Sequence, residues 1–352
     1  MRLRLRKEPV RKVDGQPALP LWLQTQQADL LRQRGHAWLL HGPSGLGQYP
    51  LGLGLVQAWL CEAPTPQGAC GECGSCHAIK VRTHADLCVL MPETAMLDLG
   101  WPLSEKAQAD IDDKKRKPSK EIRVEAMRDA VEFSQRTSAR GRGKAVLVYP
   151  AEQMNNVTAN ALLKTLEEPP GDVKFVLACE AAHQLLPTIR SRCLSHAMVW
   201  PAPAAALAWL TDLGIPAAAA AVWLRASGGR PDNALDLAQS GAAASFWSEL
   251  PRAVARGDLS KLDGLSMPQV LETLQKICLD ALACKVGGEP RFFDAKDLRD
   301  ASQQGLGADV HCLSAWGKAL AKAARTAEHP FNAGLMLEAL GQEARTALKT
   351  SG

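Results

Sequence analysis

Short apolar runs alternate with amphipathic stretches from the start of the chain to Trp200. Runs with the length of strands buried on both faces occupy residues 37–41, 86–91, 144–148 and 173–179. Stretches with helical spacing lie at 51–60, from Ser119 onward and at 158–168, where Thr158 is the expected cap and Pro169 and Pro170 the stop. This alternation predicts an α/β fold built on a parallel sheet with right-handed crossovers.

The pattern changes after Pro201 and Pro203. From there the chain is rich in alanine and leucine and has no strand-like runs. Amphipathic segments with many small residues are typical of helix bundles. We therefore expect an all-helical region to follow the α/β part.

Residues 42–49 read GPSGLGQY, which is a phosphate-binding loop in outline. Such a loop is Gly, four residues, Gly, Lys and then Ser or Thr, and Gly42, Gly45 and Gly47 keep its glycines. Gln48 stands in place of the lysine and is neutral, and Tyr49 is too long to place a hydroxyl on magnesium. The loop therefore predicts the fold of a nucleoside-triphosphatase that does not hydrolyse nucleotide. The alternative is an ordinary turn built from glycines.

The apolar run 144–148 would be the partner strand of this loop. In an active site it ends in acidic residues that hold magnesium and orient water. Here it is followed by Tyr149 and Pro150, and the first carboxylate is Glu152. A second catalytic position is therefore missing, although the run could also be a plain core strand.

Four cysteines form the second chemical motif. Cys61, Cys70, Cys73 and Cys76 are separated by eight, two and two residues, with prolines and glycines between them. Four thiolates at this spacing suit a structural, tetrahedral zinc site. Iron–sulfur ligation, disulfides and free thiols are the alternatives, and His77 or His84 could replace one cysteine.

Composition places the chain among globular proteins. It has 352 residues, 46% of them hydrophobic and 22% charged, enough for two or three domains. The six cysteines outside the motif are scattered, no apolar run approaches the ~18 residues of a membrane span, and the basic first residues lack an apolar stretch. We expect a cytoplasmic protein. A net charge of +4 is too small to indicate nucleic-acid binding.

Three segments in fixed order carry a family resemblance. They read NALLKTLEEPP at 160–170, KFVLACE at 174–180 and PTIRSRC at 187–193. Over residues 20–245 the chain resembles the clamp-loader branch of the AAA+ ATPases. The altered phosphate loop makes it most similar to the delta-prime subunits of bacterial DNA polymerase III clamp loaders.

The resemblance implies an architecture. An AAA+ α/β domain would occupy residues 1–200, with a zinc module at 61–76 and an insertion at 92–120. A helical lid domain would follow at 201–245 and a helical collar for oligomerisation at 246–352.

The resemblance also implies a role. The chain would be a non-catalytic subunit that helps ATP-driven partners load the sliding clamp on primed DNA. Those partners would be motor (gamma/tau) and delta subunits in a hetero-pentamer, with no membrane partner. The chain itself would not hydrolyse ATP, although it would belong to a DNA-directed DNA polymerase holoenzyme.

Arg192 is the one position where the resemblance implies retained chemistry. It would be an arginine finger that reaches the nucleotide site of the neighbouring subunit. Cys179 and Glu180 replace the family's polar sensor, and Asp232 replaces the arginine of the lid, with Arg230 two residues too early. A surface arginine in a salt bridge is the plain alternative, and Arg190 lies two residues away.

Two other functions are carried as alternatives. An ATP-hydrolysing motor subunit would need Lys where Gln48 stands, Asp where Tyr149 stands and the lid arginine where Asp232 stands. A zinc-ribbon nucleic-acid-binding protein would not need the segment that starts at Asn160. The basic run 114–117 (KKRK) could touch DNA, but without interleaved aromatic residues a solvated loop is favoured.

Overall fold

The computed structural model describes residues 19–302, 309–327 and 333–348. The chain forms two compact units, the first ending at Pro201 and the second beginning at Ala202. The change of sequence pattern near Pro201 therefore coincides with the boundary between the units.

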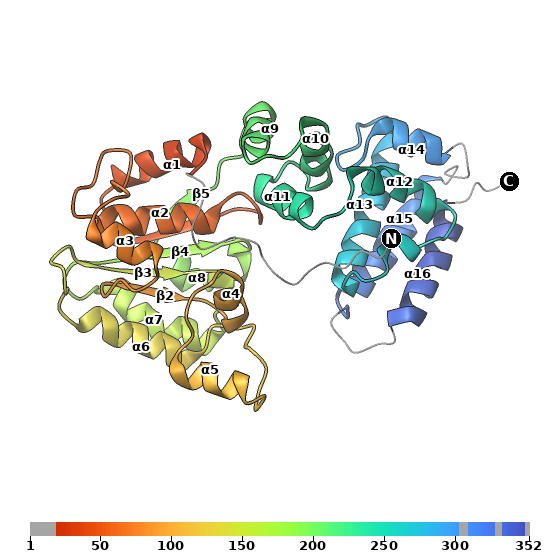
Figure 1. Cartoon of the computed structure of the whole chain (residues 1–352). Helices are drawn as coiled ribbons and strands as arrows, with labels where there is room; N and C mark the ends of the chain where they lie inside the picture. Colours follow the sequence, from red (N-terminus) through yellow and green to blue (C-terminus); the bar gives the residue numbers. More distant parts are fainter. Residues whose placement is uncertain (1–18, 303–308, 328–332, 349–352) are drawn as a thin grey trace. The chain divides into compact units, whose positions relative to one another are not determined.

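The first unit is built on a five-stranded parallel sheet (Figure 1). Its strands are β1 (Ala37–His41), β2 (Leu87–Leu90), β3 (Lys144–Val148), β4 (Val173–Cys179) and β5 (Leu194–Ala197). Their order across the sheet is β2-β3-β4-β1-β5, and Leu39 of β1 lies opposite Leu177 of β4. The predicted parallel α/β fold is confirmed. The edge strand β5 was not expected, because its residues LSHA are mostly exposed and form no apolar run.

Helices cover both faces of the sheet, as Figure 1 shows. One face packs against α1 (Leu21–Leu31) and α2 (Gln48–Leu60). The other packs against α6 (Val124–Gln135), α7 (Asn156–Glu167) and α8 (Pro187–Arg190). Successive residues of one strand point into opposite cores, as Leu39 and Leu40 of β1 do. Burial on both faces explains why the central strands are mostly apolar.

Three helices begin elsewhere than predicted. Helix α2 begins at Gln48 rather than at Leu51. The side chain of Asn155, not Thr158, caps α7 by accepting a hydrogen bond from the Thr158 amide at 3.0 Å. Thr158 is buried inside the first turn, and its hydroxyl donates to the Ile122 carbonyl at 3.1 Å. Helix α6 begins at Val124 rather than at Ser119, whose backbone amide donates a hydrogen bond to Glu93 at 2.8 Å.

The remaining short elements of the first unit connect strands. They are α3 (Gly74–Lys80), α4 (Glu93–Asp98), α5 (Glu105–Asp112), η1 (Ala151–Gln153) and η2 (Ala182–Gln184). Helices α4 and α5 lie within the expected insertion 92–120.

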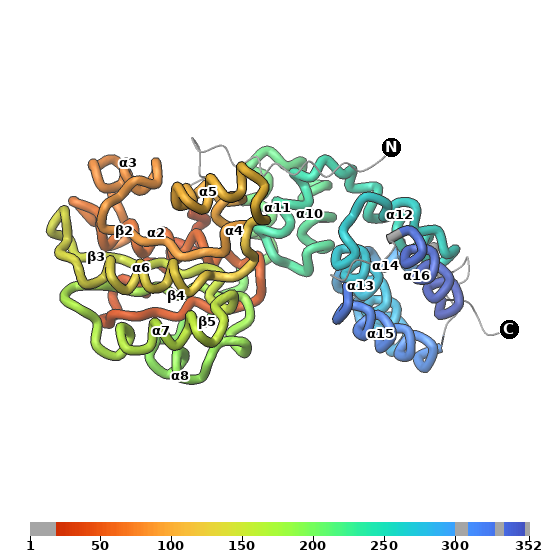
Figure 2. The backbone as a smooth tube through the Cα atoms, turned by 90° about the horizontal axis from the view of Figure 1, so that it is seen from below, coloured from red at the N-terminus to blue at the C-terminus, as the bar shows by residue number. Residues whose placement is uncertain are grey.

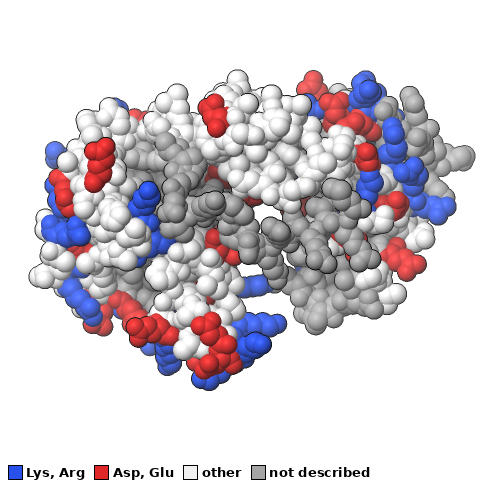
Figure 3. Space-filling model, viewed as in Figure 1, with Lys and Arg blue, Asp and Glu red and all other residues white. Residues whose placement is uncertain are grey.

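The basic run in this insertion is tied to acidic neighbours. The Arg116 guanidinium binds both carboxylate oxygens of Glu93, at 2.5 and 2.8 Å, and lowers the pKa of that carboxyl. Lys115 pairs with Asp113 at 2.9 Å. Side chains of both signs lie side by side over α5 (Figure 3). Two of the run's cations are thus already paired, which favours a solvated loop over a DNA contact.

The second unit is helical in all its described elements. These are α9 (Pro203–Asp212), α10 (Ala217–Ala226), α11 (Pro231–Gln239), α12 (Ala244–Ala255), η3 (Ser260–Leu262), α13 (Met267–Lys285), α14 (Ala295–Ser302), α15 (Val310–Ala324) and α16 (Ala333–Leu348). Figure 2 shows α13 beside α15, and both contribute to one hydrophobic core. Leu210 before residue 245 and Trp247 after it share this core, so the finer division into lid and collar stays a prediction.

A buried ion pair joins the first unit's strands to a loop. The Asp86 carboxylate accepts hydrogen bonds from the amides of Ala139 and Arg140, at 2.7 and 2.8 Å, and from the Ser138 hydroxyl at 3.0 Å. Its fourth partner is the Lys144 ammonium at 3.3 Å, and both side chains are nearly inaccessible to solvent. Burial opposes ionisation, but these donors outweigh it and lower the pKa of Asp86.

We expect Asp86→Asn to lower the free energy of unfolding by about 3 kcal/mol, because it leaves Lys144 as an unpaired buried charge. A lowered folded-state pKa stabilises the protein fully above the unfolded value, about 3.9, and this stabilisation is lost as the pH falls through the folded value. Urea unfolding should therefore show a large difference at pH 7 that narrows in acid. The exposed Asp172→Asn should change little, and an equal loss in both variants would contradict the assignment.

Candidate functional site

The glycine loop follows β1 at the carboxyl edge of the sheet and leads into α2. Gly47 precedes the helix with a φ of 91°, in the left-handed region. A Cβ atom there would lie 2.5 Å from Leu23 Cδ1 of α1, so both the turn and the packing require glycine. The loop therefore has the backbone of a phosphate cradle, with α1 packed against it.

The Gln48 side chain turns back onto this loop. Its Nε2 donates hydrogen bonds to the carbonyls of Gly42 at 2.7 Å and Pro43 at 2.8 Å, and the residue is buried. A lysine at this position extends toward the β- and γ-phosphates. The neutral amide instead links the two ends of the loop to each other.

A group of polar and aromatic side chains in contact with one another lies beside the loop. The Tyr49 hydroxyl accepts a hydrogen bond from the Trp101 indole at 2.7 Å, and the rings of Tyr49 and Tyr149 lie 5.3 Å apart. The Tyr149 hydroxyl donates to the Glu180 carboxylate at 3.0 Å, and the Glu180 amide donates to Glu152 at 2.9 Å. Tyr149 and Glu152 follow β3 and Glu180 follows β4, the positions where magnesium and the attacking water are held in an active site.

Trp101 is the residue of this network that sequence reasoning missed. It belongs to the insertion 92–120, is buried, and has the Arg82 guanidinium 4.4 Å from its ring centroid. No spacing or motif connects it with Tyr49, 52 positions earlier.

At the end of β4, Cys179 is buried, and desolvation raises the pKa of its thiol to about 12. A neutral thiol is a poor substitute for a polar phosphate sensor.

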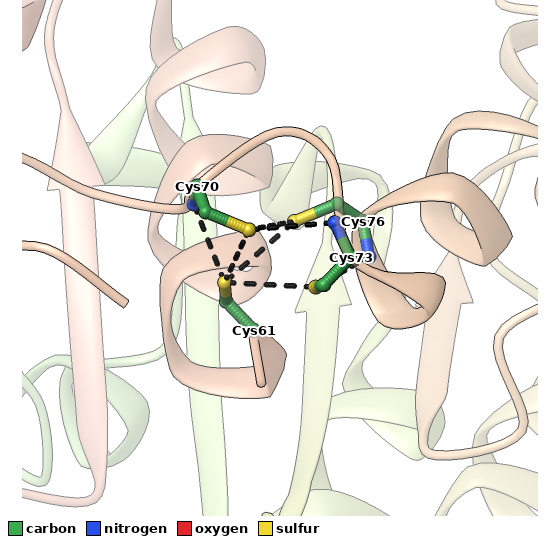
Figure 4. Close-up of side chains that lie close together, drawn as sticks. All are labelled: Cys61, Cys70, Cys73 and Cys76. Atoms are coloured by element: carbon green, nitrogen blue, oxygen red, sulfur yellow. Dashed lines mark hydrogen bonds between the residues drawn. The ribbon is translucent and has the colours of Figure 1, made fainter. Parts of the chain in front are cut away.

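The four predicted cysteines come together in space (Figure 4). Cys61 ends α2, Cys70 lies in the connecting loop, Cys73 caps α3 and Cys76 lies in its first turn. Cys61 Sγ lies 3.4, 3.8 and 3.7 Å from the sulfurs of Cys70, Cys73 and Cys76. Four sulfurs about 2.3 Å from one zinc ion are about 3.8 Å from each other, so the cluster has the size of a tetrahedral site.

Backbone amides point at these sulfurs. The amides of Cys70, Cys73 and Cys76 donate to the sulfurs of Cys61, Cys70 and Cys73 at 3.3 to 3.4 Å. Burial raises the pKa of Cys76 to about 12, whereas at Cys73 backbone donors overcome desolvation and lower the pKa to about 6. The donor set thus fits a metal that four thiolates hold and amides support. All four thiols are free, so they form no disulfide.

The two histidines considered as substitutes are not part of the cluster. His84 is buried and bonded on both ring nitrogens, to the Ser75 hydroxyl at 3.2 Å and the Asp86 amide at 3.1 Å. His77 lies exposed on α3.

Arg192 lies in the turn after α8. Its guanidinium binds the Glu167 carboxylate and donates to the Thr188 carbonyl at 2.8 Å, and about a third of the side chain is exposed. Arg190 is exposed at the end of α8. The salt bridge considered from the sequence is therefore present, and it holds Arg192 on the surface.

The lid positions lie in the second unit. Arg230 directly precedes α11, as expected from Pro231, and its Nε donates to the Ser227 carbonyl at 2.7 Å. Asp232 lies in the first turn of α11, where a carboxylate is favoured by the helix dipole.

The chain resembles replication proteins. Residues 22–199 match the family described as DNA polymerase III, delta subunit. A delta' subunit of DNA polymerase III from Escherichia coli is 32% identical over 255 residues, which cover 70% of each chain. The chain belongs to the DNA polymerase III delta' family.

Other relatives agree with the delta' assignment. The delta' subunit of Pseudomonas aeruginosa is 41% identical over 201 residues, which cover 56% of this chain and 54% of that protein. The match thus spans about half of that relative's length. The tau subunit of Salmonella typhimurium is 33% identical over 159 residues, 45% of this chain and 21% of tau. The resemblance inferred from the sequence is confirmed.

None of the described helices is long and apolar enough to cross a membrane.

We expect Tyr49→Phe to lower the free energy of unfolding by about 1–3 kcal/mol, because the buried Trp101 indole N–H loses its acceptor. Trp101→Phe supplies a control through a double-mutant cycle measured by urea unfolding. The double variant should cost less than the sum of the two single variants. Strictly additive costs would mean that the hydroxyl and the indole are not coupled.

Proposed function

We propose that this chain is a non-catalytic subunit of a DNA polymerase III clamp loader, with a nucleotide-type fold that no longer handles nucleotide. The observation that carries this proposal is the Gln48 amide bonded to the loop carbonyls of Gly42 and Pro43. Neither the charge that offsets phosphate nor the hydroxyl for magnesium remains at this loop. The Tyr149 and Glu180 contact further replaces the acidic magnesium site.

The proposed partners follow from the relatives. Similarity to tau and membership of the delta' family support assembly with motor (gamma/tau) and delta subunits into a hetero-pentamer. The motors would supply ATP hydrolysis, and this chain would act as a fixed surface against which they move. The sliding clamp and primed DNA would be reached through the complex.

Reconstitution tests this function. Mixing the full chain with motor and delta subunits should give a discrete complex by size-exclusion chromatography with light scattering, and the isolated chain should show no ATP turnover. Failure to assemble, or turnover that follows the isolated chain through purification and disappears in Gly47→Trp, would overturn the proposal. Gly47→Trp blocks the loop because even a Cβ atom there meets Leu23.

We further propose that the cysteine cluster holds a structural zinc ion. Cys61, Cys70, Cys73 and Cys76 would supply four thiolates, which leaves no open position for a reacting molecule. When bound, zinc contributes to folding rather than to a reaction. The cluster would fix the end of α2 to the start of α3.

Zinc content gives a direct test. Protein purified without chelator should contain one zinc per chain by elemental analysis, and Cys73→Ser should lose most of it and unfold at a lower temperature. Cys284→Ser changes an exposed cysteine outside the cluster and should keep both properties. Protein almost free of zinc would defeat the assignment.

Arg192 is proposed to complete the nucleotide site of a neighbouring motor. The salt bridge with Glu167 is partly exposed, so releasing the guanidinium would cost at most about 1 kcal/mol. Once released, its charge would stabilise the transferring phosphoryl group.

We expect Arg192→Ala to leave folding, zinc content and assembly unchanged and to act only in the complex. Loss of a finger lowers turnover at the site it serves by about 10³–10⁵, so total ATPase should fall in part while clamp loading falls further. The matched control is Arg190→Ala, which removes the same charge two residues away. Equal ATPase and loading rates for wild-type and Arg192→Ala complexes would sink the finger assignment, and a defect confined to Arg190→Ala would move it.

A further inference from the structure

A pocket of about 510 Å³ opens at the amino edge of the sheet, opposite the glycine loop. It lies where α1 and α2 end and where β3 and β4 begin. The strand ends contribute Arg142 and Asp172 to its lining. Among the lining residues, only Asp172 has a role above, as the site of a control variant.

The charge of the pocket is predominantly positive. Its lining contains the cations Arg32, Arg142 and Lys174 and the carboxylate Asp172, which pairs with Lys174 at 3.0 Å. Arg32 reaches Asp29 at 3.1 Å in a highly exposed pair, which contributes little and exchanges readily with another anion. Arg142 is exposed in the loop before β3. Two guanidinium groups are thus in position for an incoming acid.

The apolar part of the pocket is formed by Leu31, Ala58, Trp59, Pro64 and Pro66. This wall is stiff. Two prolines fix their own backbone, and Thr65 between them exchanges backbone hydrogen bonds with Gly68 at 2.7 and 3.1 Å. The facing loop is held as firmly, since the Lys144 amide donates to the Asp172 carbonyl at 2.9 Å and Arg140 binds Glu62 at 3.1 Å. A preformed pocket needs little ordering when a ligand binds.

We propose that this pocket binds an acidic peptide segment of a partner protein, one that carries an apolar side chain between carboxylates. The carboxylates would bind Arg32 and Arg142, whose planar groups match carboxylate geometry. The apolar side chain would pack on the part of the wall formed by Leu31 and the two prolines. This site is separate from the glycine loop, the cysteine cluster and the Arg192 turn.

Trp59 argues against single-stranded DNA as the ligand. Binding of unpaired bases relies on free aromatic faces on which they stack. The ring of Trp59 already packs on Trp38, with centroids 4.7 Å apart, and the Lys174 ammonium lies 5.9 Å from its centroid.

Fluorescence anisotropy of the full-length protein tests the proposal. The probe is an end-blocked, fluorescein-labelled peptide with the sequence Asp-Asp-Leu-Asp-Asp. Arg142→Glu should weaken its binding about tenfold, because one attractive charge becomes repulsive. Arg128 is exposed on α6, which covers the other face of the sheet. Arg128→Glu makes the same change in net charge and should change the affinity for the peptide less than twofold.

The outcomes separate the ligand classes. Binding that weakens in Arg142→Glu, and that also weakens when the central leucine of the probe becomes glycine, supports the proposal. Peptide binding that is equal in wild type, Arg142→Glu and Arg128→Glu, or undetectable at 1 mM peptide, overturns it. Tighter binding of a labelled dT12 strand, lost in Arg142→Glu, would also overturn it, in favour of a nucleic-acid site.

Discussion

A parallel sheet buried on both faces places the loops that follow its strands along one edge, and the first unit depends on this constraint. The segments after β1, β3 and β4 are far apart in the sequence but meet at the carboxyl ends of adjacent strands. In a nucleotide-handling protein these segments supply the phosphate loop, the magnesium carboxylate and the sensor. Here the same edge is retained while the side chains on it bind one another.

The side chains along this edge bind one another and the loop backbone. Gln48 links the loop carbonyls, and Tyr49 and Tyr149 extend the contact to Trp101 and Glu180. Buried polar groups are costly unless they are paired, so replacing the catalytic residues singly would leave orphaned donors and acceptors. The network pairs them together.

The cysteine cluster is connected to the sheet by a second polar network. Glu62 accepts hydrogen bonds from the amide and from the hydroxyl of Ser75. The bond from the Ser75 hydroxyl is the largest cause of the lowered pKa of Glu62. The Ser75 hydroxyl is hydrogen-bonded to the His84 ring, and His84 accepts a hydrogen bond from the Asp86 amide. The Asp86 carboxylate in turn binds the backbone of the loop before β3. The cluster is therefore connected by hydrogen bonds to the start of β2 and to the loop before β3. A small module that has little core of its own gains order from both the four thiols and this network.

The sequence by itself determined the elements and the chemistry that depend on local pattern. Apolar runs identified four of the five strands, since burial on both faces requires them, and fixed spacing identified the cysteine cluster and the altered loop. Only the tertiary structure decided the contact of Tyr49 with Trp101, the Arg192 pair with Glu167 and the cap of α7 by Asn155. The edge strand β5 also escaped prediction, because pairing with β1 rather than burial defines it. Periodicity reports which face of an element is buried, whereas the partner of a polar side chain depends on how distant segments fold together.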